Sequence, residues 1–173
     1  MPKLKPTIAN LGDLLTYDYS RFIAFEEGLK QILPVWILHA NSLKLKTILQ
    51  RYLYYAEQHF RQVEGLIDGN LSDVSSKKGK TIEKMIDDIN EKLSVCADPE
   101  VKDACLLAAI QAINHYKISM YGTAASFANA LALKKAAKLF YAAEVSEKQI
   151  DKRLSELAEQ EVNLKAKVPL ALT

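Results

Sequence analysis

Apolar side chains recur at alternating steps of three and four residues along four long segments of this chain. That spacing places them on one face of an α-helix, and a helix with a single apolar face must pack against other helices. Among 173 residues there are only six glycines and five prolines, and no segment shows the alternation of a half-buried strand. The chain is therefore predicted to be all-α.

Four long helices and one short helix follow from this periodicity. Asn10, Ser42 and Thr81 are of residue types that cap helix N-termini, and Asp98 followed by proline marks another start. Gly69-Asn70 is expected to end the second helix. The predicted helices cover residues 10–40, 42–68, 81–95, 99–131 and 133–164.

The short helix falls in the long connection between the second and third long helices. The resulting fold class is a four-helix bundle with one long crossover that carries a short extra helix. The length suits one domain, 1–173, with a core at about 10–165 and a loose C-terminal tail. Pro34 lies inside the first helix, where we expect a kink rather than an end.

Charge and composition exclude several classes of function. The 23 Lys and Arg residues nearly balance the 21 Asp and Glu residues, and no basic stripe predicts nucleic-acid binding. No apolar run reaches the length of about 18 residues that a membrane span needs. Met1–Tyr17 lacks the apolar core of a signal peptide. Cys96 and Cys105 are too few for a disulfide framework, so we expect reduced thiols and a cytoplasmic location.

Polar residues interrupt the apolar faces near the helix midpoints. Glu26 lies four residues after Phe22, Lys117 lies four after Ile113, and Glu147 lies four after Ala143. His59 and Tyr55 lie on the face of the second long helix. Antiparallel packing would bring all of these residues to one level of the core.

Charged side chains at such positions need a partner or a metal ion, because an unpaired buried charge is costly. Inward carboxylates at one level of a helical bundle are how di-iron proteins build their site. The Glu-x-x-His motif of that class is absent, since none of the three histidines has a glutamate three residues before it. The residues therefore leave a metal site and an internal ion cluster both open.

An internal salt bridge is the sharper hypothesis. Lys117 would lie within about 4 Å of Glu26 or Glu147, with Asn114 and Tyr55 supplying further hydrogen bonds. Two other interpretations compete with it. The Lys117 side chain could reach solvent along the bundle surface while the two glutamates are partly exposed, and His59 with Tyr55 could be an ordinary hydrogen-bonded core pair.

Two segments resemble a known family. EVKDACLLAAIQAINHYKISMYGT at 100–123 and EKQIDKRLSELA at 147–158 are similar to helices of the YciF-type ferritin-like stress proteins, and Glu26 and Pro34 fall at matching spacing. The resemblance covers about residues 10–165. It implies a bacterial, stress-linked ferritin-like bundle, usually a homodimer, with a dinuclear metal site between the helices.

The chain departs from that family at the metal ligands. Glu26 matches the carboxylate of the first helix, His59 falls where the family has His or Gln, and Glu147 and Asp151 match acidic residues of the last helix. Tyr54-Tyr55 replaces a glutamate pair, and Asn114-His115-Tyr116-Lys117 replaces Glu-His-Tyr-Glu. Because divalent ions need several anionic ligands, we expect a degenerate metal site.

Three hypotheses on function follow. The first is a non-catalytic bundle protein without a cofactor, whose role is structural or interactive and whose protein partner is unknown. The second is a protein that binds iron or manganese at a reduced site made of Glu26, His59, Glu147 and Asp151. The third is a carrier of a small apolar ligand, lined by Tyr52, Tyr55, Phe127 and Phe140.

Overall fold

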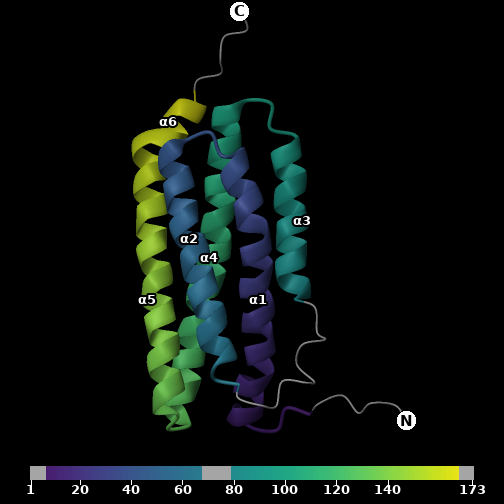
Figure 1. The fold of residues 1–173 in the computed structure, drawn as a ribbon, viewed down its shortest axis with the longest axis vertical. Helices are drawn as coiled ribbons and strands as arrows, with labels where there is room; N and C mark the ends of the chain where they lie inside the picture. The colour runs from purple at the N-terminus through teal and green to yellow at the C-terminus, as the bar shows by residue number, and fades with distance from the viewer. Residues whose placement is uncertain (1–6, 68–78, 168–173) are drawn as a thin grey trace, which may run out of the picture.

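A computed structural model describes residues 7–67 and 79–167 (Figure 1). The described residues form helices and no strand, as predicted. The elements in chain order are α1 (Leu11–His39), α2 (Leu43–Glu64), α3 (Lys80–Ser94), α4 (Pro99–Ala130), α5 (Lys134–Leu157), a π-helical turn η2 (Ala158–Val162) and α6 (Asn163–Ala166).

The four long helices close into a bundle. The pairs that pack together are α1 with α2, α2 with α5, α5 with α4, and α4 with α1. In Figure 1, α1 and α5 run in one direction, whereas α2 and α4 run in the other. The chain therefore crosses the length of the bundle between α2 and α4, and α3 lies in this crossover, against α1 and α4. The predicted all-α arrangement is confirmed.

Three predicted helix starts are confirmed by their caps. The Asn10 side chain accepts a hydrogen bond from the backbone N–H of Asp13 at 3.0 Å. Ser42 Oγ accepts one from the N–H of Leu45 at 3.3 Å. Asp98 accepts from the first turn of α4, just before Pro99. These side chains satisfy N–H groups that have no partner inside the helix.

Two predicted boundaries are corrected. Thr81 does not cap α3, which begins at Lys80 after Gly79. A Cβ atom on Gly79 would lie 2.8 Å from the Cβ of Ala24, so α3 enters against α1 where only glycine fits. The helix α2 ends at Glu64 with Gly65 after it, earlier than predicted. Gly69-Asn70 lies outside the described residues.

The last predicted helix is interrupted by a π-turn. After Leu157 the chain forms η2 and then continues as α6 to Ala166. Glu161, within η2, pairs with Lys44 of α2 at 2.6 Å and with Lys165 at 3.0 Å. Pro34 lies inside α1, which continues to His39. No helix in the described ranges is both long and apolar enough to cross a membrane.

The core consists of two apolar clusters, one toward each end of the bundle. Between these clusters, each along its own helix, lie the polar residues Glu26, His59, Lys117 and Glu147. Glu26, for example, follows Phe22 of one cluster and precedes Leu29 of the other. Lys117 lies in the same way between Ile113 and Tyr121. The fold therefore places a polar layer between two apolar halves of the core.

A lysine-centred candidate site in the bundle core

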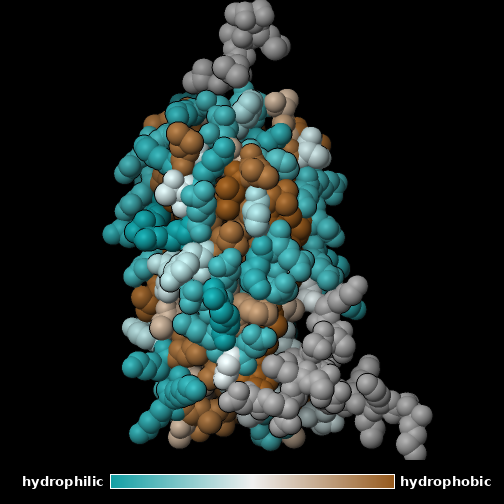
Figure 2. All heavy atoms as spheres, viewed as in Figure 1, coloured by the Kyte–Doolittle hydropathy of each residue, from teal (hydrophilic) through white to brown (hydrophobic). Residues whose placement is uncertain are grey.

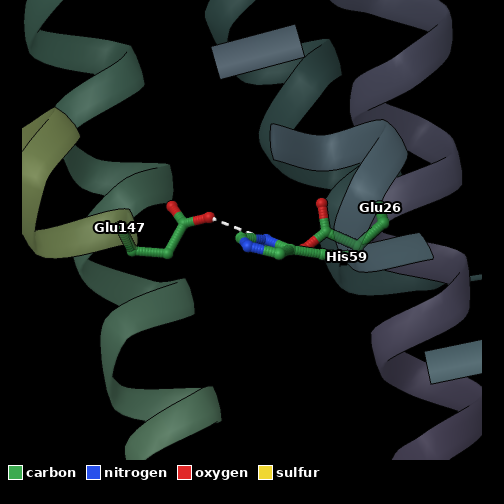
Figure 3. Close-up of side chains that lie close together, drawn as sticks. All are labelled: Glu26, His59 and Glu147. Carbon is green, nitrogen blue, oxygen red and sulfur yellow. Dashed lines mark ion pairs between the residues drawn. The ribbon is translucent and has the colours of Figure 1, made fainter. Parts of the chain in front are cut away.

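Each of the four long helices contributes one acidic or basic side chain to this layer. Glu26 comes from α1, His59 from α2, Lys117 from α4 and Glu147 from α5. The exposed fractions are 0% for Glu26, Lys117 and Glu147 and 3% for His59. Figure 3 shows Glu147 and His59 reaching toward each other, with Glu26 beside the imidazole. The interpretation of the two glutamates as partly exposed is therefore wrong.

Lys117 joins the two carboxylates. Its Nζ lies 3.0 Å from Oε1 of Glu26 and 2.5 Å from Oε1 of Glu147. The same nitrogen lies 4.7 Å from the ring centroid of Tyr52 and 5.9 Å from that of Tyr121, within the range of cation–π attraction. The predicted salt bridge is confirmed, and the interpretation of Lys117 as a side chain that reaches solvent is wrong.

Neighbouring side chains satisfy part of the remaining hydrogen-bonding capacity. Asn114 Nδ2 donates to Oε2 of Glu147 at 2.7 Å and to its backbone carbonyl at 3.0 Å. The hydroxyl of Tyr121 donates a short hydrogen bond to Oε1 of Glu26. His59 Nδ1 lies 3.2 Å from Glu147 Oε1 and 3.5 Å from Glu26 Oε1. The two carboxylates thus share one ammonium and one imidazole.

The contacts around Lys117 are close but poorly directed. Within the described residues, Lys117 Nζ, His59 Nδ1 and Glu26 Oε2 have no partner at hydrogen-bonding angles. Coulomb attraction therefore holds the centre of the cluster more than directional hydrogen bonds do. Such attraction is strong here because the groups are buried away from water, where the effective dielectric constant is low.

The pKa shifts agree with a charged pair. Burial lowers the pKa of Lys117, but attraction to Glu147 and Glu26 outweighs it, so the pKa is raised from its ordinary value. Burial raises the pKa of Glu147, whereas the charge of Lys117 and the close contact with His59 lower it, and the net shift is downward. Lys117 is therefore an ammonium and Glu147 a carboxylate at neutral pH.

The surrounding side chains respond to the two carboxylates in the same way. Burial lowers the pKa of His59, but its close contacts with the carboxylates of Glu147 and Glu26 raise it above its ordinary value overall. Burial and the nearby negative charges raise the pKa of Tyr52 and of Tyr121 well above the ordinary value. Both phenols therefore stay protonated. A protonated His59 together with Lys117 would balance the charge of the two glutamates.

Some predicted site residues lie elsewhere, and two were missed. Asp151 lies at the bundle surface, where its Oδ1 is 2.7 Å from Nε2 of His115. The prediction of Asp151 as a metal ligand beside Glu26, His59 and Glu147 is therefore not supported by the structure. Tyr55 is partly buried with its ring stacked on His59, and no hydrogen bond joins it to the cluster among the described residues. Tyr121 supplies the hydrogen bond expected of Tyr55. The second missed residue, Tyr52, packs beside the ammonium.

The predicted apolar ligand site is not formed as expected. Tyr52 and Phe140 are both 0% exposed and belong to the two different apolar clusters of the core. Tyr55 and Phe127 are partly buried and pack against separate clusters. These four side chains therefore do not line one common space.

The polar layer has ligand atoms that favour a metal ion and a positive charge that opposes one. Glu26, His59 and Glu147 each offer one ligand atom, and these atoms lie within 4.8 Å of one another, so the group is of a kind that can bind a metal. The ammonium of Lys117, however, already lies against both carboxylates. A positive charge at that point repels a divalent ion and removes the negative charge that would attract it. With Lys117 charged, the residues do not fit a dinuclear metal centre.

Comparisons with known proteins agree with this fold. The pattern of the family described as a domain of unknown function, DUF892, matches residues 10–167, and the chain belongs to this family. Protein YciF of Escherichia coli is 30% identical over 158 residues, which cover 90% of this chain and 95% of that protein. The resemblance predicted from the helix segments is confirmed.

Two solved structures are similar over nearly their whole length. The crystal structure of the E. coli stress protein YciF matches with a TM-score of 0.82 at 28% identity, covering 90% of this chain and 99% of that one. YcfI of Rhodopseudomonas palustris, a candidate structural protein, matches with a TM-score of 0.81 at 23% identity, covering 88% and 97%.

The ion cluster makes a prediction about pH. Lys117→Met removes the ammonium and leaves two buried carboxylates, which are costly while charged. Protonation relieves that cost, so the destabilisation caused by the substitution is expected to be largest near pH 7 and to shrink toward about pH 4. In the parent, the pKa of Glu147 is lower in the folded state than in the unfolded state. The resulting stability is fully present at pH values above the unfolded-state pKa, and it is lost as the pH falls through the folded-state pKa.

The measurement is the unfolding free energy of both proteins from denaturant titrations at several pH values. If Lys117 served only as a packing residue, the difference between parent and variant would be the same at every pH.

Proposed function

We propose that this chain is a ferritin-like bundle protein in which an internal ion cluster replaces a dinuclear metal site. Its role is structural or interactive rather than catalytic. The observation that carries the proposal is the position of Lys117 Nζ, 3.0 Å and 2.5 Å from the two carboxylates. One ammonium there offsets the repulsion between the glutamates, as metal ions would, and fills part of the same space.

The setting of this role is inferred from the family. The E. coli relative is called a stress protein, and we extend a stress-linked role in the bacterial cytoplasm to this chain. Both cysteines are free thiols, which suits a reducing compartment. Residues 1–173 would then act as one domain with its own core.

A homodimer is part of the proposal. On the face shown in Figure 2, apolar surface gathers over the upper part of α1. Near the end of α1, Val35 is 43% exposed and Leu38 is 81% exposed, and Leu43 at the start of α2 is 77% exposed. Exposed apolar groups of this kind are stabilised by contact with a second surface.

Metal analysis tests the proposed function. Protein purified without chelators is expected to contain fewer than about one iron or manganese ion per chain, because the ammonium opposes a divalent ion. Lys117→Glu, which exchanges the cation for a ligand, is the matched variant and is expected to hold more metal than the parent. A reproducible content near two ions per chain in the parent, with ferroxidase activity, would contradict the proposal.

The second candidate function is a reduced metal site at Glu26, His59 and Glu147. It is favoured by the close approach of their ligand atoms, within 4.8 Å of one another. The same analysis separates the candidates, since a reduced site would give about one ion per chain that Glu147→Gln abolishes.

A further inference from the structure

A cavity of about 730 Å³ lies where α1, the first turn of α3 and α4 meet. It shares no lining residue with the ion cluster. Its volume falls within the range of about 300–1,000 Å³ that small-molecule sites occupy. A second cavity of about 180 Å³ continues between α1 and α4 and shares Arg21, Tyr116 and Met120 with the first.

Part of the cavity lining is aromatic and apolar. The ring of Tyr116 is backed by the buried ring of Phe25, on which it stacks at a centroid distance of 5.0 Å and an interplanar angle of 15°. Ile82 of α3 and Met120 of α4 add aliphatic and thioether surface to the lining. Surfaces of this kind favour a flat apolar body, through ring contacts and through the removal of apolar area from water.

The lining of the cavity also carries positive charge. Arg21 and Lys80 both line it. Arg21 Nη2 donates to the hydroxyl of Tyr116 at 3.2 Å, which holds the guanidinium against the aromatic wall. Its carboxylate neighbour, Asp18, is 3.7 Å from Nη1, a long and partly exposed contact. Within the described ranges, Lys80 has no ion-pair partner. The lining thus carries two cations, and the carboxylate beside Arg21 is not among the lining residues.

We infer that this cavity binds a small organic anion with a flat apolar body. The anionic group of the ligand, a carboxylate or sulfonate, lies against Arg21 and Lys80. The guanidinium can give such a group two parallel hydrogen bonds. The flat body packs against the ring of Tyr116 and against Ile82 and Met120. This site is independent of the proposed role of Lys117.

Two fluorescent probes with the same apolar body test the inference. Anilinonaphthalene sulfonate carries the anionic group, and phenylnaphthylamine lacks it. Saturable binding of the sulfonate to the folded protein is expected, at least about tenfold tighter than binding of the neutral probe, because charge-assisted hydrogen bonds add to the apolar contact.

Variants of the full chain locate the binding. Arg21→Gln and Lys80→Gln are each expected to weaken the sulfonate about five- to tenfold and to leave the neutral probe nearly unchanged. Arg51→Gln, on the exposed face of α2 outside the cavity, is the matched control and should bind both probes like the parent. Met120→Trp, which fills the space, should abolish binding of both probes. Circular dichroism melting confirms that each variant is folded.

Three results would overturn the inference. They are the absence of saturable binding to the folded parent, equal affinity for the charged and neutral probes, and unchanged sulfonate affinity in both cation variants. Because Lys117→Met leaves the cavity lining intact, this folded variant should bind the sulfonate like the parent. Its affinity therefore reports on the cavity and not on the ion cluster.

Discussion

Replacing Lys117 with methionine is expected to lower the free energy of unfolding by about 3–5 kcal/mol at neutral pH. Methionine keeps much of the side-chain volume, so the loss comes from the missing charge rather than from a large cavity. Glu26 and Glu147, both 0% exposed, would then lie close together without the ammonium between them. The imidazole of His59 and the hydrogen bonds from Tyr121 and Asn114 would remain. Denaturant unfolding followed by circular dichroism measures the change.

Lys148 provides the matched control, because it belongs to an ion pair of similar length at the surface. Its Nζ lies 2.6 Å from Glu144, but its side chain is 58% exposed. Water and salt screen such a pair, so Lys148→Met is expected to leave the unfolding midpoint nearly unchanged. Equal effects of the two substitutions would mean that burial adds nothing to the Lys117 pair.

Trp36→Ala is the second substitution with a large expected effect, about 3–5 kcal/mol of unfolding free energy. The side chain is 0% exposed, and its indole Nε1 donates to Oδ1 of Asn90 at 2.9 Å. It therefore fills core space and also ties α1 to the crossover helix α3. Its removal leaves a cavity and breaks the hydrogen bond to Asn90, an exposed residue whose amide oxygen then turns to water.

Asn90→Ala separates the two contributions. It removes the hydrogen bond but leaves the indole in place, and is expected to cost about 1 kcal/mol. Both variants are compared with the parent in the same denaturant titration. A loss below about 1 kcal/mol for Trp36→Ala would contradict the packing of α3 against α1 that the structure shows.

Helical periodicity alone predicted the centre of the site. Glu26, Lys117 and Glu147 each occupy a place that the apolar stripe leaves empty, and a residue at such a place must face the bundle interior. The direction of each helix then fixes the level at which its midpoint residue lies. Burial makes an unpaired charge costly, so the contact between these three residues followed from the same argument.

The neighbours of the cluster depended on details that periodicity does not contain. A helical stripe can continue by three or by four residues, a difference of about 100° around the axis. The sequence pattern favoured Tyr55, whereas packing turns Ala56 of α2 and Tyr121 of α4 inward. Asp151 was expected in the site because of the family resemblance, but its helix faces it toward His115 at the surface.

The helix ends that a side chain caps were predicted correctly, whereas the helix ends whose position depends on tertiary packing were missed. Asn10, Ser42 and Asp98 cap through local hydrogen bonds, which a sequence shows directly. The start of α3 instead depends on the approach of Gly79 to Ala24, which lies far from it in the sequence. The π-turn after Leu157 likewise had no signal in the apolar pattern.

The central claim is that the ammonium of Lys117 neutralises the two buried carboxylates, and a double-mutant cycle tests it most directly. The cycle compares the unfolding free energies of the parent, Lys117→Met, Glu147→Gln and the double variant at neutral pH. The account predicts a coupling energy of about 2 kcal/mol or more, with the double variant more stable than Lys117→Met alone, because one stranded charge is gone. A coupling energy below about 0.5 kcal/mol, meaning that the effects of the two substitutions simply add, would contradict this claim.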